Sequence, residues 1–575
     1  MLRRGRTMTV NRSKQVSLLA KDDEATYKTM SDSACHDIGL DAIVKAVTSD
    51  PKEQQMIMRI LSRMTPSEET AVYRRDVFED ILNLPDVREK LLELMNQIDY
   101  LKDYGSWRKN SDEKPGLWDL LHRLEELKSY ITTVESLAEC LGDPRIKAEG
   151  LTALRDYVGE LYEDGCFAAM KKDIEELKTD ASSIQSVTIG INVNSKFEAE
   201  SLGLVSVNSK PFKKSGIVSN FADAVAARDR INKDAAWDGD LHYDPAEPPE
   251  TDGMIDRLDK QLTTMSKLTH PMLGQEATLA RVPEGDGTTN STFYLSGVAT
   301  KMTAHLVKRL RTVLSRYSDI SIVTISKLIP ELIYYIRFAE FIESAEKREM
   351  HFCKPEIVAE GSVIMQAEGL YNLKLASTLD SKDIVDNDLT FDGKRTIYLL
   401  TGANRGGKTT ITQAVGQLFA LAQGGIFVPC RSFVYKPADM IYTHFPADED
   451  KTMDLGRLGE ECVRFKDIYD QATPSSLILL NESFSTTSFE EGYYIAVDSV
   501  RALSTKGVRT IFNTHMHKLA ADAGELGPNV SSIVMISDGG KRSFKVVESS
   551  PEGSSYARDI AEKYGVTYEM LTARS

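Results

Sequence analysis

Apolar residues recur at helical spacing through residues 41–185, where glycines are few. The run 88–95 carries a charged stripe beside an apolar one, and leucines return at helical spacing through 117–127. Such stripes predict long amphipathic helices that bury one face against neighbouring helices. Core packing accounts for each stripe, so none of them by itself indicates a ligand.

The pattern changes near Ser186. Every second residue of 187–193 is Val or Ile, which predicts a half-buried strand, and 202–207 predict a second strand after a turn. Residues 238–253 are rich in acids and prolines and predict an exposed loop. Residues 186–300 are therefore expected to interrupt the helical part of the chain with strands and an acidic loop.

Helical spacing returns after residue 300. The stripe Leu306, Leu310 and Leu314 predicts one helix. The apolar run Ile320–Ile336 contains a proline and two charged residues, so it predicts a broken, buried helix rather than a membrane span. Basic side chains around the leucine stripe fit either a contact with nucleic acid or, more commonly, a solvated helix face. They are Lys308, Arg309, Arg311 and Arg316.

Short strands and helices alternate from about residue 351, which is typical of an α/β domain. Of the 575 residues, 41% are hydrophobic and 27% are charged, and the mean hydropathy is −0.29. These values exclude a disordered or collagen-like chain. The net charge of −16 argues against a protein that coats nucleic acid by bulk charge, although it leaves room for a local basic surface.

The cysteines and histidines show no disulfide or metal-binding pattern. Six cysteines stand without a Cys-x-x-Cys pair, and nine histidines lack ligand spacing. Residues 1–40 begin with a basic stretch and a short apolar segment that does not fit a secretory signal, so we expect a flexible tail. Together these features predict a cytoplasmic protein with reduced thiols and no membrane contact.

A phosphate-binding loop follows residue 401. The apolar run 396–400 predicts a strand, residues 402–409 read Gly-Ala-Asn-Arg-Gly-Gly-Lys-Thr, and 411–422 predict a helix. A strand, a glycine-rich loop and a helix form the context in which a P-loop binds a nucleotide. Glycines let backbone N–H groups turn toward phosphate oxygens, and the helix N-terminus adds positive partial charge.

Two side chains of this loop carry specific chemistry. Lys408 is expected to reach the β- and γ-phosphates, and the Thr409 hydroxyl is expected to bind Mg²⁺. The residues expected to contact nucleotide here are Gly402, Asn404, Gly406, Gly407, Lys408, Thr409 and Thr410.

A second strand, 476–480, ends in Asn481 and Glu482, where a hydrolase of this type carries acids. Glu482 is expected to polarise the attacking water as general base. The position of Asn481 normally carries an aspartate that holds Mg²⁺. Since an amide oxygen lacks the full charge, we expect weaker Mg²⁺ binding and slow hydrolysis. His515 ends the predicted strand 509–514, where it fits a hydrogen bond to the γ-phosphate, although spacing alone favours a surface histidine.

Residues 401–410 resemble the ATPase motif of MutS-type mismatch repair proteins, which usually reads Thr-Gly-Pro-Asn-Met-Gly-Gly-Lys-Ser-Thr. Ala403 and Arg405 depart from that motif, whereas its asparagine and its Gly-Gly-Lys core match. Further segments resemble the family in the same order along the chain. They are 421–429, 441–444, 477–488, 513–515 and 555–557.

This resemblance implies a multidomain protein. An α-helical core and lever would carry a small clamp with β-strands, and an α/β P-loop ATPase domain of the ABC type would follow. The segments expected on this basis are a flexible tail (1–40), the helical core and outgoing lever (41–185), the clamp-like insertion with strands and the acidic loop (186–300), the returning lever helices (301–350) and the ATPase domain (351–575). The nucleotide implied is ATP, with Mg²⁺.

In this family two ATPase domains face each other, and a signature loop of one subunit caps the ATP of the other. The matching segment is 455–461, in which Gly456 stands near the position of a family serine. Backbone N–H groups of Gly456 and Gly459 are expected to take over the contact. Adenine is expected to stack on Tyr371. The resemblance thus implies a homodimer that ATP induces.

The family reads mismatches with an N-terminal domain, for which the residues before the helical region leave no room, so mismatch reading is not expected. The leading hypothesis is an ATP-driven dimeric clamp that binds duplex or branched DNA through its backbone and serves DNA repair. The alternative is an ATP-dependent interaction protein whose helical arms grip a protein. Residues 201–250 favour this alternative, because they hold six basic side chains against eight acidic ones.

Overall fold

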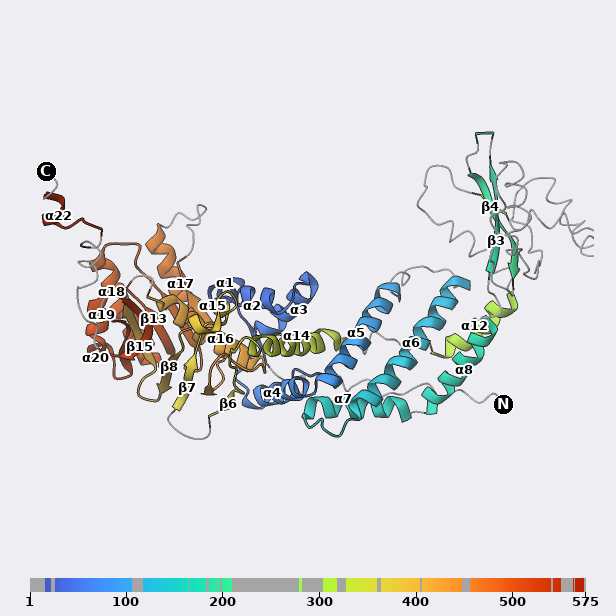
Figure 1. Cartoon of the computed structure of the whole chain (residues 1–575), viewed down its shortest axis with the longest axis horizontal. Coiled ribbons are helices and arrows are strands. Elements are labelled where there is room, and N and C mark those ends of the chain that lie inside the picture. The colour runs from blue at the N-terminus through green and yellow to red at the C-terminus, as the bar shows by residue number, and fades with distance from the viewer. Residues whose placement is uncertain are drawn as a thin grey trace, which may run out of the picture. The chain divides into compact units, whose positions relative to one another are not determined.

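The computed structural model describes residues 16–21, 26–105, 117–163, 165–181, 186–193, 195–196, 199–208, 279–281, 304–317, 327–358, 363–403, 406–446, 456–538, 541–549, 562 and 564–572. The chain divides into two compact units, and Figure 1 labels many of their elements. The first unit comprises Met1–Met8, Leu94–Ala138 and Val158–Ser326, and the second comprises Thr9–Glu93, Glu139–Tyr157 and Lys327–Ser575.

The first unit is built mainly from helices in its described part. α8 (Gly165–Ala181) and α12 (Ala304–Leu314) lie within it, whereas α5 (Pro85–Gly105), α6 (Leu117–Leu141) and α7 (Glu149–Glu163) contribute residues to both units. Their presence confirms the long helices that the apolar stripes predict.

Two of the basic side chains around the leucine stripe of α12 pair with acids of α8. Arg316, in the short turn η3 (Ser315–Tyr317), has its Nη1 3.2 Å from an Oδ atom of Asp173. The Nη2 of Arg309 lies 4.0 Å from a carboxylate oxygen of Glu176. The chain itself thus pairs part of this basic surface with its own acids.

A three-stranded antiparallel sheet also belongs to the first unit. β3 (Ser186–Val193) pairs with β4 (Ala199–Asn208), which pairs with β5 (Leu279–Arg281). Both strands that the alternating pattern predicts in this region are therefore present. The acidic loop expected at 238–253 lies outside the described residues.

A helical layer opens the second unit. Its helices are α1 (Asp32–Asp37), α2 (Leu40–Val47), α3 (Pro51–Leu61), α4 (Glu68–Asn83) and α14 (Ile329–Glu346). α14 packs against α2, α3 and α4, and Arg337 on it donates to the two carboxylate oxygens of Glu53 at 2.9 and 2.7 Å. Pro330 sits in the first turn of α14, where no helical hydrogen bond needs its N–H. The earlier part of the run expected to form a broken helix, 320–326, lies outside the described residues.

A flexible tail was expected over residues 1–40, and the structure corrects this for the residues it describes, whereas 1–15 and 22–25 lie outside them. Among the described residues of this segment, Leu18 is fully buried, and its N–H donates to the carboxylate of Glu331 at 2.6 Å. β1 (Lys28–Thr29) pairs with β2 (Arg63–Met64). Partners far along the chain order this segment, and local apolar spacing carries no sign of them.

A six-stranded sheet forms the centre of the second unit, in the order β11-β12-β13-β9-β14-β15. The strands from β11 to β14 in this order run parallel, and β15 is antiparallel to β14. Their bounds are β9 (Ile397–Gly402), β11 (Ile441–His444), β12 (Leu477–Asn481), β13 (Arg509–Asn513), β14 (Val530–Asp538) and β15 (Lys541–Glu548). Continuous apolar runs suit strands that are covered on both faces, and the strands that the sequence predicts here are confirmed.

Helices cover both faces of this sheet (Figure 1). α18 (Phe489–Lys506), α19 (His517–Ala521) and α20 (Ala523–Leu526) bury apolar side chains against one face. α16 (Lys408–Gln423) packs on the other face and confirms the helix predicted after the glycine-rich loop. Gly416 permits this close approach, because a Cβ there would stand 2.9 Å from a leucine of β12.

A four-stranded sheet in the order β6-β10-β7-β8 completes the second unit. Its strands are β6 (Glu356–Ile357), β7 (Val363–Leu370), β8 (Asn387–Asp392) and β10 (Ser432–Tyr435). The remaining elements are α15 (Leu373–Ala376), η4 (Ser381–Asp383), α17 (Arg457–Gln471) and α22 (Tyr568–Thr572). In the part of the chain that the structure describes, no helix has the length and apolar character needed to cross a membrane.

Candidate functional site

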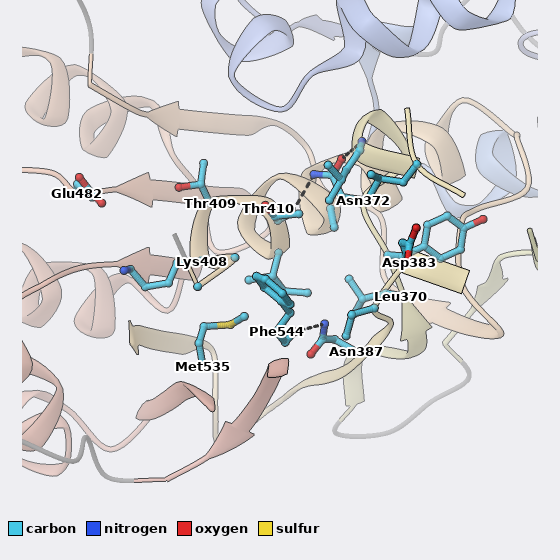
Figure 2. Close-up of a pocket in the computed structure, with 18 residues that line it drawn as sticks. Leu370, Asn372, Asp383, Asn387, Lys408, Thr409, Thr410, Glu482, Met535 and Phe544 are labelled. Atoms are coloured by element: carbon cyan, nitrogen blue, oxygen red, sulfur yellow. Dashed lines mark hydrogen bonds between the residues drawn. The ribbon is translucent and has the colours of Figure 1, made fainter. Parts of the chain in front are cut away.

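A pocket of about 330 Å³ opens where β9 runs into α16 (Figure 2). The turn 406–407 and the first residues of α16 form one side of it. Residues of β7, of β8 and of the segment between them form the other side, and Met535 and Phe544 contribute from β14 and β15. The carboxyl end of a parallel strand followed by a helix N-terminus is a place where anionic ligands bind.

Glycines shape the turn between β9 and α16. Gly402 and Gly407 have φ angles of 143° and 98°, which residues with a Cβ rarely adopt. A Cβ on Gly406 would lie 2.7 Å from a backbone carbonyl oxygen. Gly407 caps α16 without a side-chain hydrogen bond, so N–H groups of the first turn are available to an anion. Asn404, which was expected to contact nucleotide, lies outside the described residues.

Lys408 is the first residue of α16, and only 5% of it is exposed. Its Nζ donates to the carbonyl oxygens of Gly402 and Ala403, at 3.0 and 3.3 Å. Burial lowers the pKa of Lys408, and the Glu482 carboxylate partly opposes that shift. A poorly solvated ammonium group that donates to neutral carbonyls gains free energy when phosphate oxygens replace them.

Thr409 faces the ends of two neighbouring strands. Its Oγ1 donates to Asn481 Oδ1 at 3.1 Å, and Asn513 at the end of β13 donates to the same amide oxygen. Hydroxyl and amide oxygens suit Mg²⁺, which keeps several waters and binds through nucleotide phosphates. Within the described residues, no three His, Cys, Asp or Glu side chains gather as a metal cage. Thr409 and Asn481 therefore fit a Mg²⁺ that arrives with a nucleotide.

Glu482 and His515 meet beside these oxygens. Glu482 follows β12 with a φ of 54°, and its N–H donates to the Asn513 carbonyl at 2.8 Å. This left-handed backbone conformation turns the carboxylate out of the strand line toward the pocket, which it lines. Its Oε1 lies 2.7 Å from His515 Nε2. The structure thus brings the expected general base together with His515, which is exposed, as spacing alone favours.

Gly456 and Gly459 lie at the start of α17. Gly456 is the N-cap residue and is exposed, and no side chain caps this end of the helix in the described structure. Neither glycine lines the pocket beside Lys408. The structure therefore does not bring them to the P-loop of their own chain.

A hydrogen-bond network ties α17 to the ends of β11 and β12. His444 Nδ1 lies 2.6 Å from Ser483 Oγ, and its Nε2 lies 3.1 Å from the Glu461 carbonyl oxygen. The N–H of Phe484 donates to Glu461 Oε2 at 2.6 Å. Burial lowers the pKa of His444 to about 4, so its imidazole is neutral near pH 7. The backbone that follows the general base is thus held by α17, a link that sequence analysis missed.

Tyr371, the residue expected to stack on adenine, lines the pocket but is only 3% exposed. Its ring packs edge-on to His351, with ring centroids 5.7 Å apart, and its hydroxyl donates to the His351 carbonyl at 2.9 Å. Asn372 Nδ2 donates to the Thr410 carbonyl at 2.9 Å and joins this wall to α16. Tyr371 is therefore a wall of the pocket and offers little surface for stacking.

Phe544 is an aromatic side chain of the pocket that sequence analysis missed (Figure 2). It is 40% exposed, and a ring carbon lies 3.4 Å from the place of a Cβ on Gly407. A register shift between β14 and β15 and a φ of 56° turn Phe544 out of its strand. Asn387 holds this bulge, because it accepts from the Val546 N–H at 2.8 Å and donates to the Phe544 carbonyl at 3.1 Å.

Comparison with known proteins matches two regions of the chain. Residues 398–573 match MutS domain V, and residues 67–220 match the MutS2 N-terminal domain. The chain is similar to the DNA mismatch repair protein MutS of Chlorobium phaeovibrioides, with 30% identity over 40% of this chain and 27% of that protein. It is also similar to the Endonuclease MutS2 of Thermus thermophilus, with 30% identity over 33% of this chain and 25% of that protein. The chain thus matches about a quarter of the length of these relatives.

Proposed function

We propose, since this chain belongs to the MutS family, that the pocket between β9 and α16 binds ATP with Mg²⁺ and hydrolyses it. One observation carries the proposal. The glycine turn, Lys408 and two oxygen-bearing pairs, Thr409–Asn481 and Glu482–His515, all lie at the carboxyl ends of β9, β12 and β13. Phosphoryl transfer to water needs such a set: N–H groups and a cation for the phosphates, oxygens for Mg²⁺, and a base for water.

In this proposal the triphosphate lies against the N-terminus of α16. Lys408 exchanges its carbonyl partners for β- and γ-phosphate oxygens. The Thr409 hydroxyl and the Asn481 amide oxygen hold Mg²⁺, which supplies charge neutralisation when it is bound. Glu482 accepts a proton from the attacking water, and His515 orients that carboxylate through their contact of 2.7 Å. Because Asn481 is uncharged, we expect slow hydrolysis.

We assign the adenine to the side of the pocket formed by β7, β8 and β15. The exposed ring of Phe544 supports this assignment, since an exposed aromatic face can stack on a base. Tyr371 then closes the pocket behind the base without stacking on it.

A second copy of the chain completes the site in this proposal. N–H groups at the start of α17, from Gly456 to Gly459, cap the γ-phosphate that the partner copy binds. The exposure of Gly456 and the absence of a side-chain cap there, within the described residues, support this role. ATP then favours a homodimer, and the contacts of His444 and Glu461 connect the capping helix to the backbone beside Glu482.

We propose that the rest of the chain binds a macromolecular partner. We propose a helical core and outgoing lever at 41–185, a clamp at 186–300, returning lever helices at 301–350 and the ATPase domain at 351–575. The partner proposed is duplex or branched DNA, bound without sequence preference, in mismatch repair or recombination. The names of the relatives, a DNA mismatch repair protein and an endonuclease, support DNA as the partner.

A protein partner is the second candidate, and charge favours it. Residues 201–250 hold eight acidic side chains against six basic ones. The basic residues Arg309 and Arg316 pair with acids of α8. A surface that binds phosphates through counterion release needs unpaired Lys and Arg.

Steady-state ATP hydrolysis by the purified full chain, with and without duplex and branched DNA at low salt, separates the two candidates. A change in rate that saturates with DNA and weakens with added salt would support the DNA clamp. Hydrolysis that is indifferent to every DNA, with partners in a pull-down that survive nuclease, would contradict it and favour the protein-gripping arms. A Lys408→Met variant controls for contaminating ATPases.

A further inference from the structure

Two asparagines end neighbouring strands beside Thr409. Asn481 ends β12 and Asn513 ends β13, and the two residues are paired in the sheet register. Asn513 is fully buried and Asn481 is 8% exposed. Asn513 Nδ2 donates to Asn481 Oδ1 and also lies 3.4 Å from Thr409 Oγ1. One amide therefore presents its N–H₂ group to both oxygens that are proposed to hold Mg²⁺.

An amide at the metal edge has a problem of orientation that a carboxylate does not have. Both oxygens of a carboxylate accept hydrogen bonds, so a half-turn of the side chain changes nothing. A half-turn of Asn481 instead exchanges an acceptor for the N–H₂ donor. That donor would face the Thr409 hydroxyl and any metal-bound water, and water on a metal ion acts as a donor itself. An asparagine at this position therefore works only if a neighbour fixes its orientation.

We propose that Asn513 is the positioning residue that keeps the Asn481 amide oxygen turned toward Thr409 and the metal side. The Asn513 N–H₂ group donates a hydrogen bond to the Asn481 oxygen in the observed orientation of Asn481. If Asn481 were flipped, its own N–H₂ group would face that of Asn513, and no hydrogen bond could form. This inference rests on the proposed function of the pocket. It adds that the uncharged metal edge is a pair of amides and not a single asparagine.

The orientation of Asn513 itself supports this role. Its Oδ1 is buried and has no hydrogen-bond partner in the described structure. An unpaired buried carbonyl is destabilising, and a residue that only filled space would gain nothing from this orientation. Turning Asn513 over would place its oxygen against Asn481 Oδ1, so two acceptors would face each other. The donor contact to Asn481 and Thr409 is what holds Asn513 in this orientation.

A double-mutant cycle tests the proposal. The four proteins are wild type, Asn513→Ala, Asn481→Asp and the double variant, each as the full chain with its fold checked by circular dichroism. Fluorescence anisotropy of a fluorescent ATP analogue gives the Mg²⁺ concentration for half-maximal binding, a readout that does not depend on hydrolysis. Losing one buried hydrogen bond predicts a rise of about fivefold to tenfold for Asn513→Ala in the wild-type background.

The same substitution should change the Mg²⁺ requirement by less than about twofold in the Asn481→Asp background, because either carboxylate oxygen can then face the metal. Asn513→Leu keeps about the same side-chain size and carries neither a donor nor a charge, so it serves if the alanine variant does not fold. Without the N–H₂ donor it should raise the Mg²⁺ requirement by about the same factor as Asn513→Ala.

Several outcomes would overturn the proposal. An equal effect of Asn513→Ala in both backgrounds would make it a structural residue, and no effect in the wild-type background would remove it from the metal edge. A normal Mg²⁺ requirement for Asn513→Leu would contradict the donor role. Failure of wild type to bind the analogue at any Mg²⁺ concentration would instead refute the proposed function of the pocket, so the two failures are distinguishable.

Discussion

Replacing Phe544 with alanine should weaken ATP binding while the fold persists. The ring is 40% exposed and contacts the pocket beside Gly407. Stacking of a base on an aromatic ring contributes about 1–3 kcal/mol. A partly exposed ring belongs at the lower end of that range, and about 1.4 kcal/mol corresponds to a tenfold rise in Kd. We therefore expect Phe544→Ala to raise the Kd for ATP about tenfold.

The backbone at Phe544 supplies a matched control. Its φ of 56° costs a residue with a Cβ about 1–2 kcal/mol. Phe544→Gly relieves this strain and should be more stable to unfolding than Phe544→Ala by about 1 kcal/mol. Both variants lack the ring and should lose the same affinity. Phe544→Tyr keeps a stacking face and should bind ATP nearly as wild type does.

Isothermal titration of each variant with MgATP and with inorganic triphosphate gives the answer. Inorganic triphosphate carries no base, so its Kd should be the same for wild type and Phe544→Ala. If Phe544→Ala binds ATP as tightly as wild type, the ring does not contact the base. If triphosphate affinity falls as well, Phe544 acts on the phosphate loop and the assignment of the base is wrong.

Three further substitutions test other parts of the account. With MgATP at a concentration about 100 times its Kd, the free energy of unfolding of wild type should rise by about 2.7 kcal/mol, whereas that of Lys408→Met should not change. A rise of the same size in Lys408→Met would show that Lys408 does not bind the nucleotide. Burial lowers the pKa of His444 from 6.5 to about 4. The neutral imidazole therefore contributes its full share to the free energy of unfolding above pH 6.5, and this share is lost as the pH falls through 4. Between pH 7 and pH 4, urea titrations should show wild type losing about 3 kcal/mol relative to His444→Gln, and parallel losses would contradict this reasoning. Arg74 is 1% exposed and donates to two backbone carbonyls at 2.8 and 2.9 Å. Arg74→Met should therefore lower the free energy of unfolding, measured by chemical denaturation, by about 3 kcal/mol. The control Arg155→Met, at a half-exposed arginine, should lower it by under about 1 kcal/mol.

Local patterns predicted the elements around the phosphate loop well. Continuous apolar runs and glycines within about ten residues are enough to predict three elements. They are the strand before Gly402, the helix from Lys408 and the strand that ends at Asn481. Parallel strands bring their carboxyl ends to one edge of a sheet. The proximity of Lys408, Asn481 and Glu482 could therefore be expected from sequence alone.

Features that depend on distant partners escaped prediction. Leu18 is buried by contacts with α14, more than 300 residues away, and no local stripe marks it. The side chain of Phe544 points into the pocket because of a register shift between β14 and β15 and a hydrogen bond from Asn387 to the Phe544 carbonyl. Tyr371 was a reasonable choice by position, but its surroundings bury it. The donor role of Asn513 likewise emerges only when β12 and β13 are paired.

The central claim is that this chain hydrolyses ATP with Glu482 as the base. The most direct measurement is single-turnover hydrolysis of radiolabelled MgATP by wild type and by Glu482→Gln, alongside the Kd of each for ATP. We expect measurable hydrolysis by wild type and a loss of about 100-fold or more in the variant, because general base catalysis contributes about 10²–10⁴-fold. The Kd for ATP should change by less than about twofold, because the glutamine keeps the size of the side chain and Lys408 holds the phosphates. Equal hydrolysis by the two proteins, or none by wild type while ATP is bound, would contradict it.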